Sequence, residues 1–171
     1  MTNGPMLDLT VNDKGIGEAL NLFTRGEGHV ELKVRASVSS QFPLDRVEVL
    51  LNGKAIATAP LASDGRSARF EQSLRIDRSG WVALRASGPA VPDVQGELLY
   101  AHTSPVYVVV DGKAASSVED ARYFLTWIDR LWNAVLDRDR FPDKQSQEQV
   151  HAEIEEARKY FQKIIDRGED Q

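Results

Sequence analysis

Apolar and polar residues alternate over most of the first part of the chain. Between His29 and Val38 the apolar residues take every second position, and nearly all the charged residues lie between them. This period of two is typical of an antiparallel strand with one buried and one solvated face. Further strands are predicted over residues 7–11, 47–51, 54–57, 68–76, 81–86, 97–101 and 106–110. About eight strands separated by Gly, Pro, Asp and Ser turns favour an immunoglobulin-like β-sandwich.

One of these turns has a specific signature. Asn52-Gly53 separates two short apolar runs. Both residue types readily take the positive φ values of a tight two-residue turn, so a hairpin is predicted here.

The spacing of the apolar residues changes at residue 116, from every second position to every third or fourth position. Ser116 and Glu119 have the spacing of a capping box, so we expect a helix to begin there. Two amphipathic stripes follow, interrupted at Phe141-Pro142-Asp143. They consist of Ala121, Phe124, Leu125, Ile128, Leu131, Trp132, Val135 and Leu136, and then of Val150, Ile154, Ala157, Phe161, Ile164 and Ile165.

Two such helices with a short connection form an αα-hairpin. The predicted organisation is therefore a β-sandwich domain over 1–115 and a helical hairpin over 116–171 packed on it. Trp127 lies off the main stripe of the first helix, and we expect it to pack within the chain rather than on a partner.

Composition and charge narrow the range of partners. The chain has 171 residues, 42% of them hydrophobic and 27% charged, with a formal net charge of −5. The chain has no basic excess of the kind that marks a nucleic-acid surface. We expect five arginines to lie on a solvated face with interspersed carboxylates: Arg66, Arg69, Arg75, Arg78 and Arg85. No apolar run is long enough for a membrane span, and Met1–Pro5 does not resemble a signal peptide. We expect a soluble protein, with export open if a signal lies upstream, and with the oligomeric state undetermined.

The chemistry-bearing residues are sparse. The chain has no cysteine, and its three histidines, His29, His102 and His151, lack the spacing of metal ligands. We therefore predict no catalytic residue, no cofactor-binding residue, no metal site and no cofactor in this chain. The polar break His102-Thr103-Ser104 is the one loop candidate, and turn hydrogen bonding is favoured there over catalysis.

Three weaker motifs are set aside. Residues 137–148 superficially resemble a calcium loop, but Phe141 offers no ligand and Pro142 stands where that loop needs glycine. Gly15-Ile16-Gly17 and Gly26-Glu27-Gly28 are too short for phosphate-binding loops and are expected to be turns. A carbohydrate platform is weakly supported, because Trp81 is the only tryptophan of the predicted β region.

Several short stretches carry a family resemblance. They are Thr2-Asn3-Gly4-Pro5-Met6-Leu7, the run from Gln41 to Val49, Gly80-Trp81-Val82-Ala83-Leu84-Arg85, the run from Ala101 to Val108, and Asp120-Ala121-Arg122-Tyr123-Phe124. In these stretches the chain resembles the C-terminal region of bacterial metal-dependent hydrolases of the PHP superfamily, of the carbaryl hydrolase-like (CehA/McbA) type. No motif of that kind covers the last helix.

The resemblance has a functional implication. In such hydrolases a Thr-Asn-Gly-Pro-like element marks the exit from the catalytic domain, and the metal-binding histidines lie upstream of it. The resemblance therefore implies that the metal centre lies outside this chain, and it leaves open that Met1 is an introduced start. No catalytic residue is carried over, because no metal motif of the family has a matching position here.

Two functional classes are weighed against each other. The first is a non-catalytic C-terminal accessory domain that packs on the upstream catalytic domain of the same polypeptide and stabilises it or shapes access to it. The second is a free-standing β-sandwich binding module for a glycan, a peptide or a cell-surface partner. A hydrolase in its own right is disfavoured, because catalysis needs a positioned base or metal. The substrate of any parent enzyme is not determined.

Overall fold

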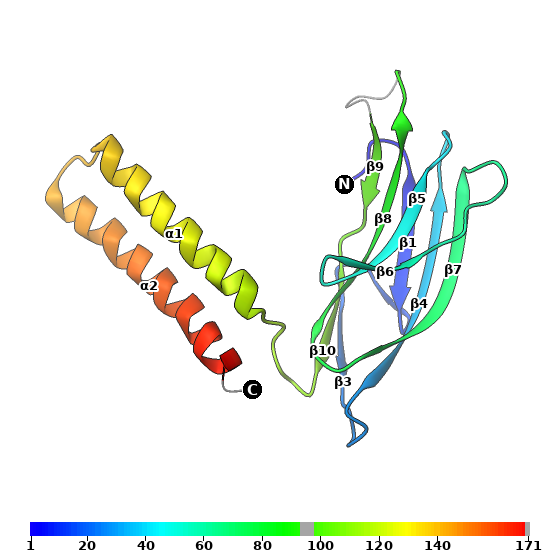
Figure 1. Ribbon diagram of the computed structural model, residues 1–171, viewed down its shortest axis with the longest axis horizontal. Helices are drawn as coiled ribbons and strands as arrows, with labels where there is room; N and C mark the ends of the chain where they lie inside the picture. Colours follow the sequence, from blue (N-terminus) through cyan, green and yellow to red (C-terminus); the bar gives the residue numbers. More distant parts are fainter. Residues whose placement is uncertain (93–97, 170–171) are drawn as a thin grey trace. The chain divides into compact units, whose positions relative to one another are not determined.

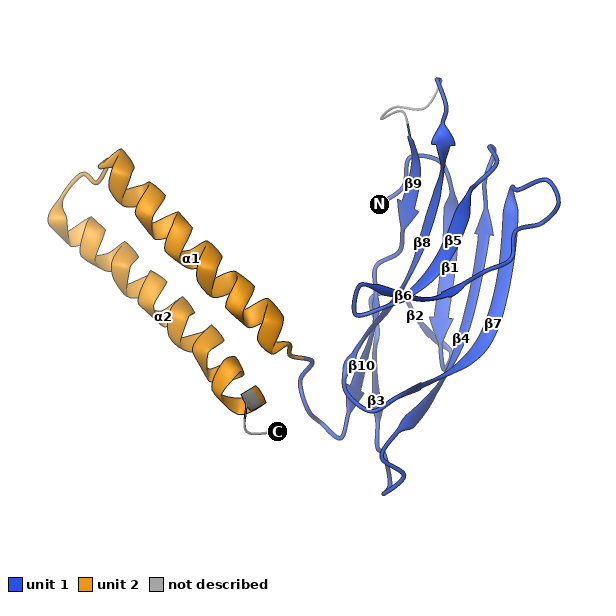
Figure 2. Cartoon of the chain, in the orientation of Figure 1, with its two compact units in different colours: residues 1–115 blue, residues 116–171 orange. Residues whose placement is uncertain are grey.

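The computed structural model describes residues 1–92 and 98–169 (Figure 1). Contacts divide the chain into two compact units, residues 1–115 and residues 116–171 (Figure 2). The first unit is built of strands and the second of two helices. The prediction of a mainly β protein with a C-terminal helical part is confirmed.

The β unit contains two sheets. The smaller sheet has the order β2-β1-β4-β7, and its strands are β1 (Met6–Val11), β2 (Lys14–Gly15), β4 (Val30–Ser39) and β7 (Ser67–Ile76). The larger sheet has the order β3-β10-β8-β5-β6, and β9 also pairs with β8. Its strands are β3 (Ala19–Leu22), β5 (Arg46–Leu51), β6 (Lys54–Thr58), β8 (Gly80–Ala90), β9 (Leu98–His102) and β10 (Val106–Val110).

Alternation along the strands explains how the two sheets share one core. In β4 every second side chain from Val30 to Val38 is buried, as the period of two predicts. Most buried side chains of both sheets belong to one cluster, in which Leu9, Leu32, Leu84 and Leu99 are almost completely enclosed. The opposite side chains of each strand form the two outer faces of the unit.

The β5–β6 hairpin forms at the predicted turn. Asn52 and Gly53 have φ values of 50° and 81°, which a two-residue turn requires. The Asn52 side-chain oxygen accepts the N–H of Trp81 at 2.9 Å. A Cβ on Gly80 would lie 2.5 Å from that same oxygen, so the neighbouring strand needs glycine at this position.

Two short strands were missed by the sequence pattern. β2 includes Gly15, which was expected to be part of a turn, whereas Gly17 has the positive φ of 82° that a turn uses. β3 pairs in parallel with β10, and every other pairing is antiparallel among the described strands. A strand of four residues has too few positions for a period of two to stand out. Of the predicted strand over 97–101, residue 97 lies outside the described residues.

The helical unit consists of α1 (Val118–Arg138) and α2 (Lys144–Glu169). The predicted start was wrong by one residue: Ser117, not Ser116, caps α1, and its hydroxyl accepts the N–H of Asp120 at 3.1 Å. Ser117 and Asp120 repeat the spacing of Ser116 and Glu119 one position later, and the structure uses this second pair. The other end of α1 is closed by Asp139, which has a left-handed backbone conformation.

The predicted break between the helices is present. Asp143 accepts the N–H of Ser146 at 2.7 Å and so caps the start of α2. This hydrogen bond lowers the pKa of Asp143. Asp139 and Asp143 thus have helix-capping roles in the segment that superficially resembles a calcium loop.

Candidate functional site

The outer face of the larger sheet gathers the polar and aromatic side chains that the sequence separates. Register places His102 opposite Arg85, and Arg85 opposite Glu48, in one row across β9, β8 and β5. Farther along the same face, beyond the row of Ala83 and Leu50, Tyr107 lies opposite Trp81. We call this the large-sheet face and define it by Glu48, Trp81, Arg85, Tyr100, His102 and Tyr107.

Glu48 and Arg85 form the best-defined ion pair of this face. The Nε and Nη2 atoms of Arg85 donate to Oε2 of Glu48 at 3.0 and 2.8 Å, and Arg46 adds a charge 3.6 Å from Oε1. Glu48 is only 7% exposed. Because a buried carboxylate is costly without a partner, Arg85 is required where Glu48 stands.

The loop candidate His102-Thr103-Ser104 begins at the last residue of β9 and leads toward β10, and these two strands pair with different parts of β8. Thr103 is buried and bridges the gap: its N–H donates to the Leu84 carbonyl at 3.0 Å, and its hydroxyl accepts the Leu84 N–H at 3.0 Å. The Thr103 side chain thus provides the acceptor that a continuous strand would offer from its backbone. Ser104 is exposed.

His102 is half-buried, and its ring is oriented by local contacts. Its Nδ1 lies 3.1 Å from the Thr103 carbonyl oxygen, and its ring meets Tyr100 edge-on at 5.8 Å. A carbonyl only accepts, so Nδ1 is the donor of this hydrogen bond. His102 is thus oriented by the loop, and its sheet neighbours are Arg85 and Tyr100 rather than a nucleophile.

The aromatic content of this face exceeds what the sequence suggested. Tyr100 and Tyr107 are 42% and 48% exposed and lie on the same face as Trp81. Counting tryptophans alone left these tyrosines out. In the sheet Tyr107 lies opposite Trp81, whereas Tyr100 lies opposite Ser87, farther along β8. Trp81 is still the only tryptophan of the β unit, and Tyr100 and Tyr107 add two exposed aromatic residues to the same face.

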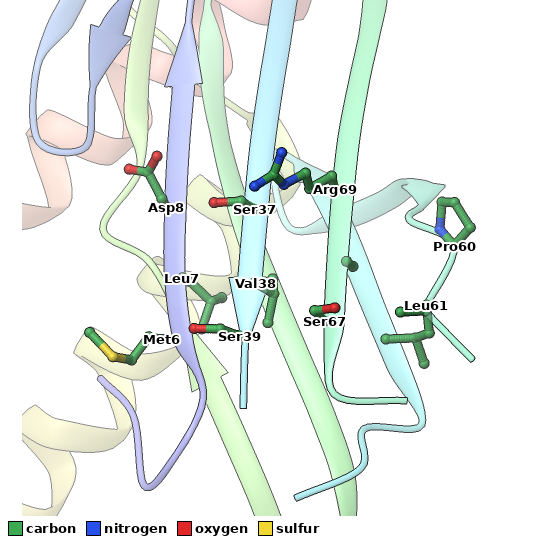
Figure 3. A pocket seen from close by; sticks show the side chains of 12 residues that line it. Met6, Leu7, Asp8, Ser37, Val38, Ser39, Pro60, Leu61, Ser67 and Arg69 are labelled. Carbon is green, nitrogen blue, oxygen red and sulfur yellow. The ribbon is translucent and has the colours of Figure 1, made fainter. Parts of the chain in front are cut away.

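A groove of about 690 Å³ lies on the smaller sheet (Figure 3). Its base follows two rows of paired positions, Met6–Ser39–Ser67 and Asp8–Ser37–Arg69. Figure 3 shows Asp8 and Arg69 on either side of Ser37. The lining thus combines two opposite charges, serine hydroxyls and the apolar chains of Met6 and Leu61.

Outside the groove, the outer face of the smaller sheet carries several ion pairs. Lys33 and Arg35 both contact Glu71, at 2.9 and 3.6 Å, and Arg75 contacts Glu31 at 3.3 Å. The hydrogen bond from Lys33 is the main reason why the pKa of Glu71 is lowered. Of the five arginines noted in the sequence, Arg75 and Arg78 contact exposed carboxylates, as expected for a solvated face. Arg85 departs from that expectation, because it lies on the larger sheet and pairs with the buried Glu48.

The other histidines do not join a site. His29 contacts the Glu27 carbonyl at 3.0 Å, whereas His151 lies 5.0 Å from the Trp132 ring and 3.9 Å from Glu155. Over residues 1–92 and 98–169, no three His, Cys, Asp or Glu side chains are arranged to hold a metal ion. In that same part of the chain, neither helix is long and apolar enough to cross a membrane.

Comparison with known proteins does not add a relative. No family model, no curated protein and no solved structure matches the chain.

Proposed function

We propose that this chain is a non-catalytic C-terminal accessory domain of a PHP-type metal-dependent hydrolase, and that it packs against the upstream catalytic domain of the same polypeptide. In this role it stabilises the catalytic domain or shapes access to it. The proposal begins from the resemblance of the Thr2-Asn3-Gly4-Pro5 element and its neighbours.

The observation that carries the proposal is how this element is attached. The Asn3 amide donates to the Leu98 carbonyl at 2.6 Å, and its oxygen accepts the Tyr100 N–H at 2.7 Å. Met1 and His102 exchange two backbone hydrogen bonds of 3.0 and 2.9 Å, so the N-terminus lies beside β9 (Figure 1). A preceding domain would therefore be joined rigidly at the sheet edge that carries Tyr100 and His102.

The composition of the large-sheet face supports a protein partner there. Its exposed tyrosines and Trp81 are residue types enriched in protein interfaces, and the Glu48–Arg85 pair supplies a fixed polar centre. An immunoglobulin-like sandwich is supported by the strand order. The order β1-β4-β7 matches strands A, B and E of that fold, and β10-β8-β5 matches G, F and C. The packing of the hairpin on the sandwich stays a prediction.

The test begins with the DNA upstream of the Met1 codon. A continuing reading frame with clustered His and Asp codons is expected, and the encoded catalytic domain is then expressed alone and with residues 1–171. Addition of the accessory chain should raise its thermal midpoint or change its ester turnover. Tyr100→Ala with Tyr107→Ala should weaken this effect, whereas Arg69→Ala, on the other sheet, should not. A closed frame, or no binding and no effect, would refute the proposal.

A second candidate function is supported by the groove. A free-standing module that binds a glycan or peptide needs a shallow surface with polar and apolar groups, which Asp8, Ser37, Arg69 and Met6 provide. The groove lacks the aromatic rings that sugar binding favours, so a peptide is the better fit. Loss of peptide-array binding in Arg69→Ala, with retention in Tyr107→Ala, would favour this second function over the first.

A further inference from the structure

Helix α1 carries two apolar stripes, of which only one is covered within the hairpin. The covered stripe, Ala121, Leu125, Ile128, Trp132 and Val135, is buried or half-buried. The hairpin is also joined by the stacked rings of Phe124 and Phe161, 5.0 Å apart, and by an Asp129–Arg158 ion pair of 2.6 Å. Even so, only Ala121 and Ile165 are fully buried among its described residues.

The second stripe of α1 consists of exposed residues, of which Phe124 also stacks on Phe161 of α2. It consists of Asp120, Phe124, Trp127, Leu131, Ala134 and Arg138. Trp127 is 48% exposed and Leu131 is 55% exposed. Within the helical unit the Trp127 ring contacts only Tyr123 and Arg130 among the described ring contacts, and its packing elsewhere in the chain stays a prediction. We call these six residues the outer seam.

The spacing of the outer seam selects a helix as its partner. Its residues recur at alternating steps of four and three, the repeat that allows side chains of one helix to fit between those of another. A helix with two such stripes contacts two neighbours, as in a four-helix bundle. Among the described residues α2 is the only other helix, so a second helix on the outer seam would come from outside them.

Exposed apolar side chains lie on and next to the outer seam. Phe124, Trp127 and Leu131 belong to the seam and are 47%, 48% and 55% exposed. Tyr123 is 59% exposed and contacts the rings of both Phe124 and Trp127 edge-on. A second helix on the seam would remove these side chains from water, which favours association.

The outer seam is complementary to itself when it is reversed. If two seams run antiparallel, Asp120 lies opposite Arg138, Phe124 opposite Ala134, and Trp127 opposite Leu131. Opposite charges then meet at both ends, and a large ring meets a small side chain. A parallel pairing would instead place Asp120 on Asp120 and Trp127 on Trp127. Twofold symmetry requires such self-complementarity of the surface.

We propose that α1 pairs antiparallel with α1 of a second copy of this chain through the outer seam, so that two hairpins form a four-helix bundle. The pairing uses the helical unit alone and does not rest on the proposed accessory role.

Sedimentation velocity of the 171-residue chain between about 1 and 50 μM tests the pairing. The wild-type chain should be dimeric at the upper concentrations. Leu131→Glu should raise the dimer Kd at least about a hundredfold, since it places a charge at the centre of the seam. Asn133→Glu adds the same charge off the seam and should leave the dimer intact. Circular dichroism checks that each variant keeps its helices.

A charge exchange tests the antiparallel direction. Asp120→Arg or Arg138→Asp alone should raise the dimer Kd on the order of tenfold at low salt, because each change creates two like-charge pairs. The double variant should return to within about threefold of the wild-type Kd. A monomeric wild-type chain, in which the β unit covers the seam or the seam stays bare, would overturn the proposal. So would a dimer unaffected by Leu131→Glu, or a double variant no better than the single ones.

Discussion

Replacing Thr103 by valine removes one oxygen and keeps the shape of the side chain. That hydroxyl oxygen accepts the N–H of Leu84 at 3.0 Å, and both residues are buried. Valine leaves the Leu84 N–H enclosed without a partner, whereas the Thr103 N–H keeps its hydrogen bond to the Leu84 carbonyl. No cavity is created, so the lost hydrogen bond is the main change.

An unsatisfied buried N–H costs about 1–3 kcal/mol, which corresponds to a roughly 5- to 150-fold lower ratio of folded to unfolded protein. For a unit with a typical stability of about 5–15 kcal/mol this is a sizeable fraction. With a urea dependence of about 1–3 kcal/mol per molar, the midpoint of unfolding should fall on the order of 1 M.

The assay is urea unfolding followed by NMR signals of residues in the β unit, so that melting of the helical hairpin does not enter the measurement. Hydrogen exchange of the Leu84 amide gives a local readout and should speed up by a similar factor. Thr103→Ser keeps the hydroxyl and should lose less stability, and Ser104→Ala should change it by less than about 0.5 kcal/mol. Equal stability of Thr103→Val and wild type, with unchanged exchange at Leu84, would refute a structural role for the hydroxyl.

Three further predictions concern charges and caps. Arg85→Ala should destabilise the β unit by about 3 kcal/mol in urea titrations, because it leaves the buried Glu48 carboxylate without its partner. Replacing both partners, as Glu48→Gln with Arg85→Met, should cost less stability. Equal losses in the two variants would contradict this reasoning. The lowered pKa of Asp143 means that its cap contributes above the ordinary aspartate pKa of 3.8 and is lost as the pH falls below it. Helicity measured by circular dichroism should decline in that pH range, and this pH-dependent decline should be absent in Asp143→Asn. Ser117→Ala should lower the free energy of unfolding of the helical unit by about 1 kcal/mol, and Ser116→Ala should change it very little. A larger loss in Ser116→Ala than in Ser117→Ala would instead support a capping box at Ser116.

Local chemistry was sufficient to predict the strongest elements. The alternation from His29 to Val38, the Asn52-Gly53 turn and the break around Pro142 each depend on residues close in sequence, and each is present in the structure. The start of α1 was missed by one residue because Ser116 and Ser117 offer the same spacing, and the choice between them depends on backbone geometry.

Residues far apart in sequence decided the rest. Glu48, Arg85 and His102 share a row only because β5 and β9 both pair with β8, and no local pattern states which strands will pair. The candidate loop was found from its polar residues, but the enclosed hydroxyl of Thr103 and its bond to Leu84 follow from the gap between β9 and β10.

The sequence by itself determined where the chain alternates, where it turns and where its period changes, since these depend on the size, polarity and backbone preference of adjacent residues. Tertiary structure alone decided which side chains meet across strands, which polar groups are enclosed and which stripe of α1 is left uncovered. Those outcomes depend on the register and packing of distant segments, whose energies add up only when the whole unit is folded.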